Sequence, residues 1–442
     1  MKFKGLLIAV IVLAALGGGV YWSNKAKEAE EKAPPKDAPP KVLAIPEDQF
    51  KSIRFQKTGG DTTVVNKSDA GKWEITQPKP LPADQDSITS VVSSLSSLTS
   101  DRLIEDKAAD LAPYGLANPS LQVTITKKDG KTEDLLVGDD TPTGGSTFVK
   151  LKTDPRVFSI SSGVKSSLDK TSKDLRDKRL LTFDSDKLTR VELQAKGQAV
   201  EFGKNNQNEW QILKPRPLRA DGSQVEDLIR KLKDAKMDTT VSDEDAKKAV
   251  SAFASGARVA AASVSDASGT QTIEVRKDKD KNYYAKSSVV EGIFKVTSDL
   301  GEGLDKDLNA FRNKKLFDFG FSDPTKITID KTTYEKSGEK WMSGGKQMDS
   351  SSVQAVVDKL RDLSSVKFLD AGSGPVVIEA AVTSNDGKRN EKVTFMKQGA
   401  TYIAKRENEP SVYELDSKAV EELQKTASEV KPYQPPKDEK KK

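Results

Sequence analysis

The sequence Asp221-Gly-Ser-Gln-Val225-Glu-Asp-Leu228-Ile229-Arg-Lys-Leu232-Lys-Asp-Ala235 has apolar residues at positions +4, +7, +8, +11 and +14 from its first Asp. This spacing places the apolar side chains on one face of an α-helix. The leading Asp is typical of a helix N-cap, because its carboxylate accepts hydrogen bonds from free N–H groups of the first turn. Gln224, three residues later, predicts a capping box. The stretch is therefore predicted to be a capped amphipathic helix lying on a core.

The same five-position pattern follows Asp84 and Asp349. After Asp84 the apolar residues are Ile88, Val91, Val92, Leu95 and Leu98, and after Asp349 they are Val353, Val356, Val357, Leu360 and Leu363. A Trp precedes each Asp, at positions 73, 210 and 341, so the Trp residues are 137 and 131 residues apart. Repeats of this length are long enough to bury a core each, and we predict three tandem copies of one unit.

Alternating runs around the helix predict strands. In the first copy they are residues 52–56, 62–66 and 71–76 before the helix, and 121–126, 133–137, 147–150 and 156–160 after it. Short turns separate them, which is typical of an antiparallel meander. The last strand recurs, with Phe158, Phe294 and Tyr413 in corresponding places. The predicted fold class is α+β, each copy being an antiparallel sheet with a packed helix.

Two similar segments, Asp174–Leu180 and Asp307–Leu316, lead into the next copy and are predicted to be connectors that lock neighbouring copies. The third copy has no such segment, since no copy follows it. The predicted boundaries are 1–22 for a transmembrane helix, 23–43 for a Pro-rich and charged spacer, 44–183, 184–318 and 319–430 for the copies, and 431–442 for a basic disordered tail.

The amino terminus predicts a membrane anchor. Residues 5–22 contain no charge and would span about 27 Å as a helix, close to the thickness of a bilayer core. Lys2 and Lys4 precede the run and favour a cytoplasmic amino end, while Tyr21 and Trp22 suit the far interface. A cleaved signal peptide is the alternative, but the residues after Val20 form a poor cleavage site. Either reading places the body on the extracytoplasmic (periplasmic) side, and we expect a single-pass cell-membrane protein.

The amino-acid composition excludes several classes of function. The chain has no His and no Cys, so disulfides, thiol nucleophiles, thiolate metal sites and His acid–base catalysis are excluded. Its net charge is +5, of which Lys2 and Lys4 supply +2 and residues 431–442 supply +3. The body between them is formally neutral, whereas nucleic-acid-binding domains are usually basic. We expect no nucleic-acid partner.

Several motifs have both a chemical and a structural interpretation, and the structural one is favoured in each. The three capping Asp could form a carboxylate site. Residues 278–282 begin like a calcium loop, but loop positions six and twelve are Tyr283 and Val289. The Gly-bearing run Gly138–Ser146 lacks a phosphate-binding signature and reads as a hairpin loop.

Three Ser-x-x-Lys matches, at 162–165, 167–170 and 364–367, are expected by chance in a chain this rich in Ser and Lys. Lys57-Thr-Gly59 precedes all of them, opposite to the order in penicillin-binding enzymes. The three Trp could stack on sugars, but a Trp in an amphipathic strand is more often part of a core.

Nearly the whole body, with copies two and three matching more loosely than copy one, resembles a bacterial family known as domain of unknown function 4340. The likeness rests on Trp73-Glu-Ile-Thr-Gln-Pro, Ala83-Asp84, Tyr114-Gly-Leu-Ala-Asn-Pro119, Val137-Gly-Asp139, Thr147-Phe-Val-Lys150 and Asp174-Leu-Arg-Asp-Lys-Arg-Leu-Leu181 with Phe183-Asp184. The resemblance implies a membrane-anchored extracytoplasmic protein and, as partner, an ABC-type transport complex related to gliding-motility exporters. It supplies no reaction and no catalytic residues.

The expected function is a membrane-anchored scaffold or accessory protein that binds envelope proteins. A binding module for cell-wall glycan or another envelope polymer is the alternative, which a row of exposed Trp and Tyr would support. A hydrolase using Asp, Glu, Ser or Lys is a third hypothesis and requires convergent, strongly shifted carboxylates. We predict that the protein is not an enzyme and has no catalytic, cofactor-binding or metal-binding residues; its ligand-binding residues are unknown at this point.

Overall fold

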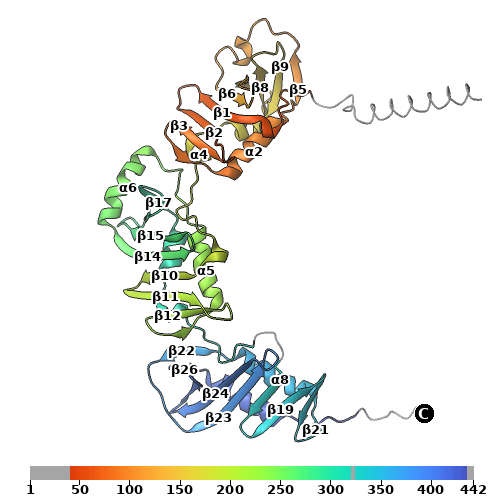
Figure 1. Cartoon of the computed structure of the whole chain (residues 1–442), viewed down its shortest axis with the longest axis vertical. Coiled ribbons are helices and arrows are strands. Elements are labelled where there is room, and N and C mark those ends of the chain that lie inside the picture. Colours follow the sequence, from red (N-terminus) through yellow and green to blue (C-terminus); the bar gives the residue numbers. More distant parts are fainter. Residues whose placement is uncertain (1–39, 320–323, 436–442) are drawn as a thin grey trace, which may run out of the picture. The chain divides into compact units, whose positions relative to one another are not determined.

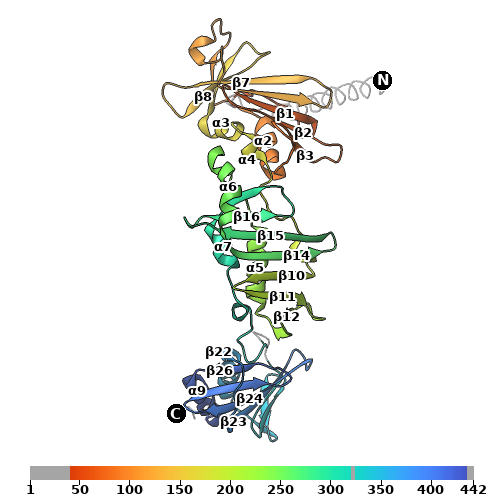
Figure 2. The same cartoon turned by 90° about the vertical axis from the view of Figure 1, so that its left-hand side faces the viewer.

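The computed structural model describes residues 40–319 and 324–435, which divide between residues 178 and 179 into two compact units. The first unit contains copy one, and the second contains copies two and three. Each copy forms its own antiparallel sheet with helices against it (Figures 1 and 2). The predicted α+β class with three antiparallel sheets is therefore confirmed.

Copy one has a nine-stranded sheet in the order β4-β3-β2-β1-β6-β7-β8-β9-β5. Before the helix come η1 (Glu47–Gln49), β1 (Phe50–Lys57), β2 (Thr62–Lys67), β3 (Trp73–Gln77) and β4 (Leu81–Pro82). The helix α2 (Gln85–Ser96) leads to β5 (Arg102–Glu105) and η2 (Ala112–Tyr114). The second half comprises β6 (Leu121–Lys127), β7 (Thr132–Asp140), β8 (Ser146–Leu151), β9 (Val157–Ser161), α3 (Ser162–Leu168) and α4 (Ser172–Leu175).

Copy two repeats this order with eight strands, β13-β12-β11-β10-β14-β15-β16-β17, shown side by side in Figure 2. Its first half comprises η3 (Ser185–Lys187), β10 (Arg190–Ala195), β11 (Gln198–Lys204), β12 (Trp210–Lys214) and β13 (Leu218–Arg219). Two helices follow, α5 (Gly222–Lys233) and α6 (Asp243–Ser255). Its second half comprises β14 (Ala257–Asp266), β15 (Gly269–Lys277), β16 (Tyr283–Ser287), β17 (Ile293–Val296), α7 (Ser298–Leu304) and η4 (Leu308–Ala310).

Copy three has the nine-stranded order of copy one, β21-β20-β19-β18-β23-β24-β25-β26-β22. Its first half comprises β18 (Lys326–Ile329), β19 (Thr332–Ser337), β20 (Lys340–Ser343), β21 (Lys346–Gln347) and α8 (Ser350–Asp362). Its second half comprises β22 (Ser365–Leu369), β23 (Val376–Ser384), β24 (Arg389–Gln398), β25 (Thr401–Arg406), β26 (Val412–Leu415) and α9 (Ser417–Ser428).

Copy two differs from the others at one sheet edge. In copies one and three a strand that follows the helix, β5 or β22, pairs with the last strand of the sheet. In copy two the chain makes a single such hydrogen bond, from Asp238 N–H to the Lys295 carbonyl, and then forms α6. Phe253 of α6 packs on Tyr284 of β16. The sequence analysis did not identify this helix.

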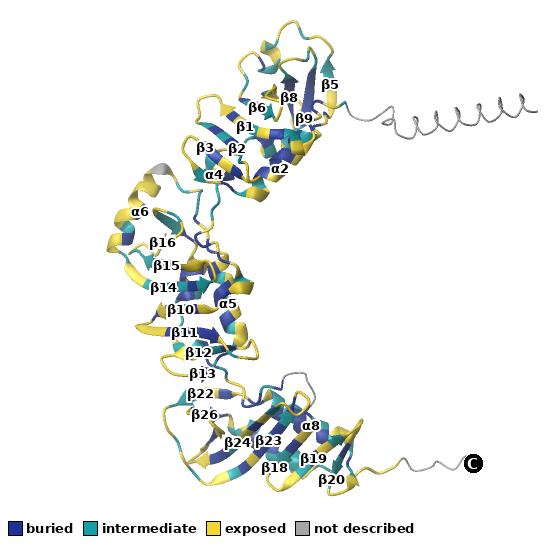
Figure 3. Ribbon diagram, viewed as in Figure 1, coloured by how far each residue is buried: buried dark blue, intermediate teal, exposed yellow. Residues whose placement is uncertain are grey.

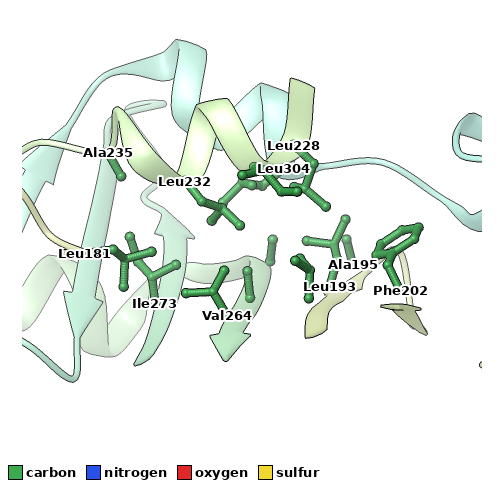
Figure 4. Packing of buried hydrophobic residues seen from close by; sticks show 14 of the residues in the cluster. Leu181, Leu193, Ala195, Phe202, Leu228, Leu232, Ala235, Val264, Ile273 and Leu304 are labelled. Carbon is green, nitrogen blue, oxygen red and sulfur yellow. The ribbon is translucent and has the colours of Figure 1, made fainter. Parts of the chain in front are cut away.

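The predicted helix faces are confirmed in all three copies. Every apolar residue of the five-position pattern is buried, and three clusters, one per copy, form the cores. In Figure 4, Leu228 and Leu232 of α5 point toward Leu193, Val264 and Ile273 of the sheet. The buried sides of α2, α5 and α8 are dark blue in Figure 3. Each helix is held mainly by the apolar face that it buries on its own sheet.

The three Asp residues that precede the five-position pattern are helix caps. Asp84 accepts from the N–H groups of Asp86 and Ser87, Asp221 from two N–H groups of its helix, and Asp349 from the N–H group of Ser352. The capping box predicted at Gln224 is not formed, because the Gln224 side chain instead accepts a hydrogen bond from Lys306 Nζ at 3.2 Å. The carboxylates of Asp84, Asp221 and Asp349, which had suggested a carboxylate site, are therefore engaged in helix capping.

The three Trp residues occupy equivalent places. Each pairs across its hairpin with a Lys, and that Lys lies over the indole ring, at 5.6 Å for Lys67, 5.0 Å for Lys204 and 5.9 Å for Lys336. The indoles are only 5, 7 and 3% exposed in Trp73, Trp210 and Trp341. The triplication is confirmed, and these Trp residues belong to cores and form no exposed row.

The chain enters each copy in the same way. The N–H groups of Val42, Leu180 and Leu316 donate to the carbonyls of Leu98, Ala235 and Leu363. These acceptors are the +14 residues of the helix pattern. Since each acceptor follows its helix directly, the entering segment is fixed to the end of the helix that covers the sheet.

The chain also leaves each copy in the same way. The N–H groups of Asp84, Asp221 and Asp349 donate to the carbonyls of Leu175, Phe311 and Lys431. The third copy therefore has an equivalent exit segment, which the sequence analysis did not expect. Residues 431–433, which begin the segment predicted as a tail, pair with Gln347–Asp349. The rest of that segment from residue 436 on lies outside the described residues.

The predicted transmembrane helix (1–22) and most of the spacer (23–43) also lie outside the described residues. No helix in residues 40–319 or 324–435 is long and apolar enough to cross a membrane.

Candidate functional site

The motifs considered for chemistry are distributed over separate structural features. Residues 278–282 form a hairpin tip in which Asp278 binds Asn282, and Gly138–Ser146 contains the β7–β8 loop. In two of the Ser-x-x-Lys matches the Lys bonds to a carboxylate, Lys165 to Asp140 and Lys367 to Glu414. Within the described residues, no group of three or more acidic side chains lies in an arrangement that could hold a metal ion.

The densest group of buried charges lies where copy three follows copy two. Arg219 of β13 forms an ion pair with Asp318, and its Nε lies 2.8 Å from Glu409 Oε1. Its Nη2 donates to Tyr413 Oη at 3.2 Å, and Tyr413 in turn donates to Glu409 at 2.6 Å. One guanidinium from copy two thus binds three side chains that belong to the entry and to the sheet of copy three.

A second arginine, Arg406 at the end of β25, extends this group. Its Nε lies 2.5 Å from Glu409 Oε1 and its Nη2 lies 3.0 Å from Glu391 Oε1. Glu391 also accepts two hydrogen bonds from the backbone N–H of Asp318, at 3.0 and 3.1 Å. We call Arg219, Asp318, Glu391, Arg406 and Glu409 the junction cluster. All five side chains are at most 22% exposed, so each charge needs the others as partners.

The protonation of the cluster follows from burial and pairing. Burial lowers the pKa of Arg219, but the charges of Asp318, Tyr413 and Glu409 outweigh it and raise that pKa above its usual value. Burial raises the pKa of Asp318, but Arg219 and Asn313 hold it below the ordinary range. Burial raises the pKa of the Tyr413 hydroxyl, and Glu409 adds to this rise against the opposing charge of Arg219. At neutral pH the arginine and the aspartate are charged and the tyrosine is neutral.

Copy two provides an internal comparison for this cluster. Thr182 and Gln271 take the places of Asp318 and Glu391, since the Thr182 N–H donates to the Gln271 side chain at 2.8 Å. The strand register also places Gln271 opposite Val264, as it places Glu391 opposite Val382. Neutral residues therefore form the same backbone contact in copy two, so this contact does not require charge.

A further arginine packs at the same junction and has no ion pair with a carboxylate of residues 40–319 or 324–435. Arg312, 8% exposed, lies 3.5 Å from the ring centre of Phe368 and donates to Ser411 Oγ at 2.8 Å. Burial lowers its pKa. The corresponding residue of the first connector is Arg176, and both form an isolated β-bridge with the residue before the helix cap, Ala83 or Ala220. Both predicted connectors thus contain an arginine at this place, half-buried in the first and buried in the second.

A cleft of about 780 Å³ opens beside the junction cluster. The β11–β12 hairpin of copy two and the β23–β24 hairpin of copy three line it, and Arg389 joins them through an ion pair with Glu209. Trp210 and Ala220 lie in its lining together with Arg219 and Asp318. The cleft therefore exists only where two copies meet.

Sequence analysis did not predict the junction cluster. The signal was present as differences between aligned copies, since Glu391, Arg406 and Glu409 replace Gln271, Ser287 and Val290. Charged residues scattered over nearly 200 positions show no local pattern, and only the strand register brings them together.

Comparison with known proteins gives one match. The profile of a family described as Domain of unknown function (DUF4340) matches residues 73–249 and, separately, residues 210–380. No curated protein and no solved structure matches the chain. The fold and junctions thus define a tandem-repeat α+β protein. The chain belongs to the DUF4340 family, as its sequence motifs predicted.

The two family matches start at equivalent residues, Trp73 and Trp210. Each runs through the second half of one copy, across a connector, and past the helix of the next copy. The segment shared by the family therefore includes the junction between two sheets.

Proposed function

We propose that this protein is a membrane-anchored scaffold or accessory protein whose body binds envelope proteins on the extracytoplasmic side. The observation that carries this proposal is that charged side chains connect copy two to copy three. Five mostly buried charged side chains, Arg219, Asp318, Glu391, Arg406 and Glu409, are bonded to one another and join consecutive copies. A cluster that joins sheets in this way stabilises a particular arrangement of surfaces.

The anchor belongs to the proposal for a physical reason. A tethered binding surface is confined to a thin layer above the membrane, which raises its effective concentration for a neighbouring membrane complex. The family resemblance favours an ABC-type transport complex as that partner. The neutral body favours protein contact over binding to a highly charged polymer.

In-cell crosslinking with mass spectrometry tests this proposal. The wild-type chain is compared with a variant in which residues 1–22 are replaced by a cleavable signal peptide, so that both bodies reach the same compartment. We expect crosslinks to envelope proteins in both forms, with a marked loss of yield in the untethered form.

Fractionation with protease protection checks the expected topology. A soluble mature chain starting after residue 22 would contradict the anchor. If neither form crosslinks to an envelope protein while the purified chain turns over a small substrate, the scaffold proposal fails and a hydrolase takes its place.

A further inference from the structure

The cleft between copies two and three has an unusual lining of amide side chains. Asn313 is one of them and donates to Asp318 Oδ1 at 2.9 Å, and the other five are Gln207, Asn208, Gln211, Asn385 and Asn390. Four of these five are exposed and Gln211 is half-buried, and they come from the two hairpins that face each other across the cleft. Within the part of the chain that the structure describes, their side-chain amides make no hydrogen bond to another residue. Each therefore offers one acceptor oxygen and two donor hydrogens to a ligand.

The charged groups of the cleft are largely neutralised. Arg219, Arg389 and Arg406 each form an ion pair with a carboxylate at or beside the cleft. Lys388 is the remaining basic residue of the lining and has no ion-pair partner among the described residues. The negative charge of Glu226, which also lines the cleft, offsets the positive charge of Lys388. A strongly charged ligand would have to break existing pairs, so the lining favours an uncharged ligand.

Trp210 gives the cleft a fixed aromatic wall. Its Nε1 donates to Glu226 Oε1 at 2.6 Å, and the Lys204 ammonium lies 5.0 Å from the ring centre. These contacts hold the indole in one orientation. The ring is mostly buried, so it supplies an edge at the cleft floor and does not form an open stacking platform.

Backbone pairing argues against an extended peptide as the ligand. The strand β12 is paired on both sides, by β11 and β13, and β24 is paired by β23 and β25. No strand that lines the cleft from these two hairpins therefore has an open edge for strand addition. The lining also lacks the apolar side-chain pockets that anchor a helical peptide.

We propose that this cleft binds an uncharged oligosaccharide through its hydroxyl groups. A hydroxyl donates and accepts at once, and an amide side chain matches both functions without adding charge. The volume of about 780 Å³ lies within the range typical of ligand sites, about 300–1,000 Å³. The inference goes beyond the scaffold function and does not depend on it.

Calorimetric titration of the purified full-length chain tests the proposal, in a buffer free of sugar-based detergents. The probes are triacetylchitotriose and maltotriose as neutral trisaccharides, trigalacturonate as an anionic one, and an uncharged tetrapeptide. We expect at least one neutral trisaccharide to bind, and trigalacturonate and the peptide to bind more weakly or not at all.

Variants locate the binding. The double variant Gln211→Ala/Asn390→Ala removes one amide from each hairpin and is expected to weaken trisaccharide binding about tenfold or more. The matched control, Gln56→Ala/Gln398→Ala, removes two exposed amides elsewhere and should bind as the wild type does. Circular dichroism verifies that both variants fold.

Three results would overturn the proposal: no neutral saccharide binds, the control weakens binding equally, or the tetrapeptide binds best and loses affinity in the cleft variant. None of these results alters the crosslinking test of the scaffold function, so the two proposals fail separately.

Discussion

Arg406 of copy three and Ser287 of copy two occupy the same position in their sheets, and each side chain donates to the carbonyl of the leucine that begins its copy, Leu316 or Leu180. One hydroxyl suffices for this contact in copy two. The guanidinium of Arg406 makes the same contact and has further N–H groups left, which bind Glu391 and Glu409. The larger donor thereby connects the entry segment to a charged network.

Removing Arg219 alone should destabilise the second junction. Arg219→Met leaves Asp318 without its ion-pair partner at a mostly buried position and leaves Glu409 with Arg406 alone, and such a loss typically costs about 3 kcal/mol. We expect faster hydrogen exchange of the amides of residues 311–319, measured by mass spectrometry, with exchange in β6 and β7 unchanged.

Replacing Arg219 together with its two carboxylate partners by neutral residues, with the Arg406–Glu391 pair kept, should restore much of that loss. The variant Arg219→Met/Asp318→Thr/Glu409→Val introduces the residue types found at Thr182 and Val290 of copy two. Well-packed neutral replacements of buried ion pairs are often nearly neutral in stability. If the triple variant is less stable than Arg219→Met, the expectation is wrong. The charged side chains would then stabilise the junction by more than neutralising one another.

The junction should respond to acid through Asp318. Its pKa is lower in the folded chain than the ordinary value of about 4. A depressed pKa contributes stability that is present above the unfolded value and is lost as pH falls through the folded value. Exchange of residues 311–319 should therefore be protected near neutral pH and accelerate, beyond the intrinsic change, only below about pH 4. Asp318→Asn should lose this acid-dependent part.

The junction should respond to alkali through Tyr413. Its pKa is raised by burial, so its contribution is present below the ordinary tyrosine value of about 10 and is lost as pH rises through the folded value. The pKa is raised at Tyr114, Tyr284 and Tyr334 as well, so spectrophotometric titration should show a group of tyrosines that ionise late, and Tyr413→Phe should reduce that group by one. A titration of Tyr413→Phe that matches the wild type would contradict the assignment.

Two glycines of copy two should respond oppositely to alanine. A Cβ at Gly301 would lie 2.1 Å from Tyr283 Cδ1, whereas one at Gly222 would meet nothing within 4 Å. Alanine improves helix propensity by about 1 kcal/mol, but overpacking typically costs about 1–3 kcal/mol. We expect Gly301→Ala to destabilise copy two and Gly222→Ala to stabilise it slightly, as judged by exchange of β14–β16.

The three helix caps should act locally and alike. Asp84→Ala, Asp221→Ala and Asp349→Ala should each lower the stability of their own copy by about 1 kcal/mol, and the Asn variants should cost a few tenths. Urea unfolding followed by hydrogen exchange measures this. Unequal losses that Asn does not rescue would indicate a role for the carboxylates beyond capping.

Sequence reasoning predicted the helix faces and the sheets because their periodicity is local. Ile88 and Leu95, for example, lie on one face by spacing alone, and their burial follows from it. Residues whose roles depend on register were not predictable in this way. Asp318 and Glu391 are 73 positions apart and meet only because β23 and β24 pair as they do. The α6 helix was missed because nothing corresponds to it in the other copies.

The exit segment at Lys431–Tyr433 has a consequence for the length of the array. Copies one and two use this position for the connector that continues into the next copy, and copy three fills it with residues 431–433. The third sheet is thus bridged in the same manner as the other two. Such a module can be gained or lost whole by recombination between its exit segment and the next entry segment, because a cut at that place leaves its own core cluster intact.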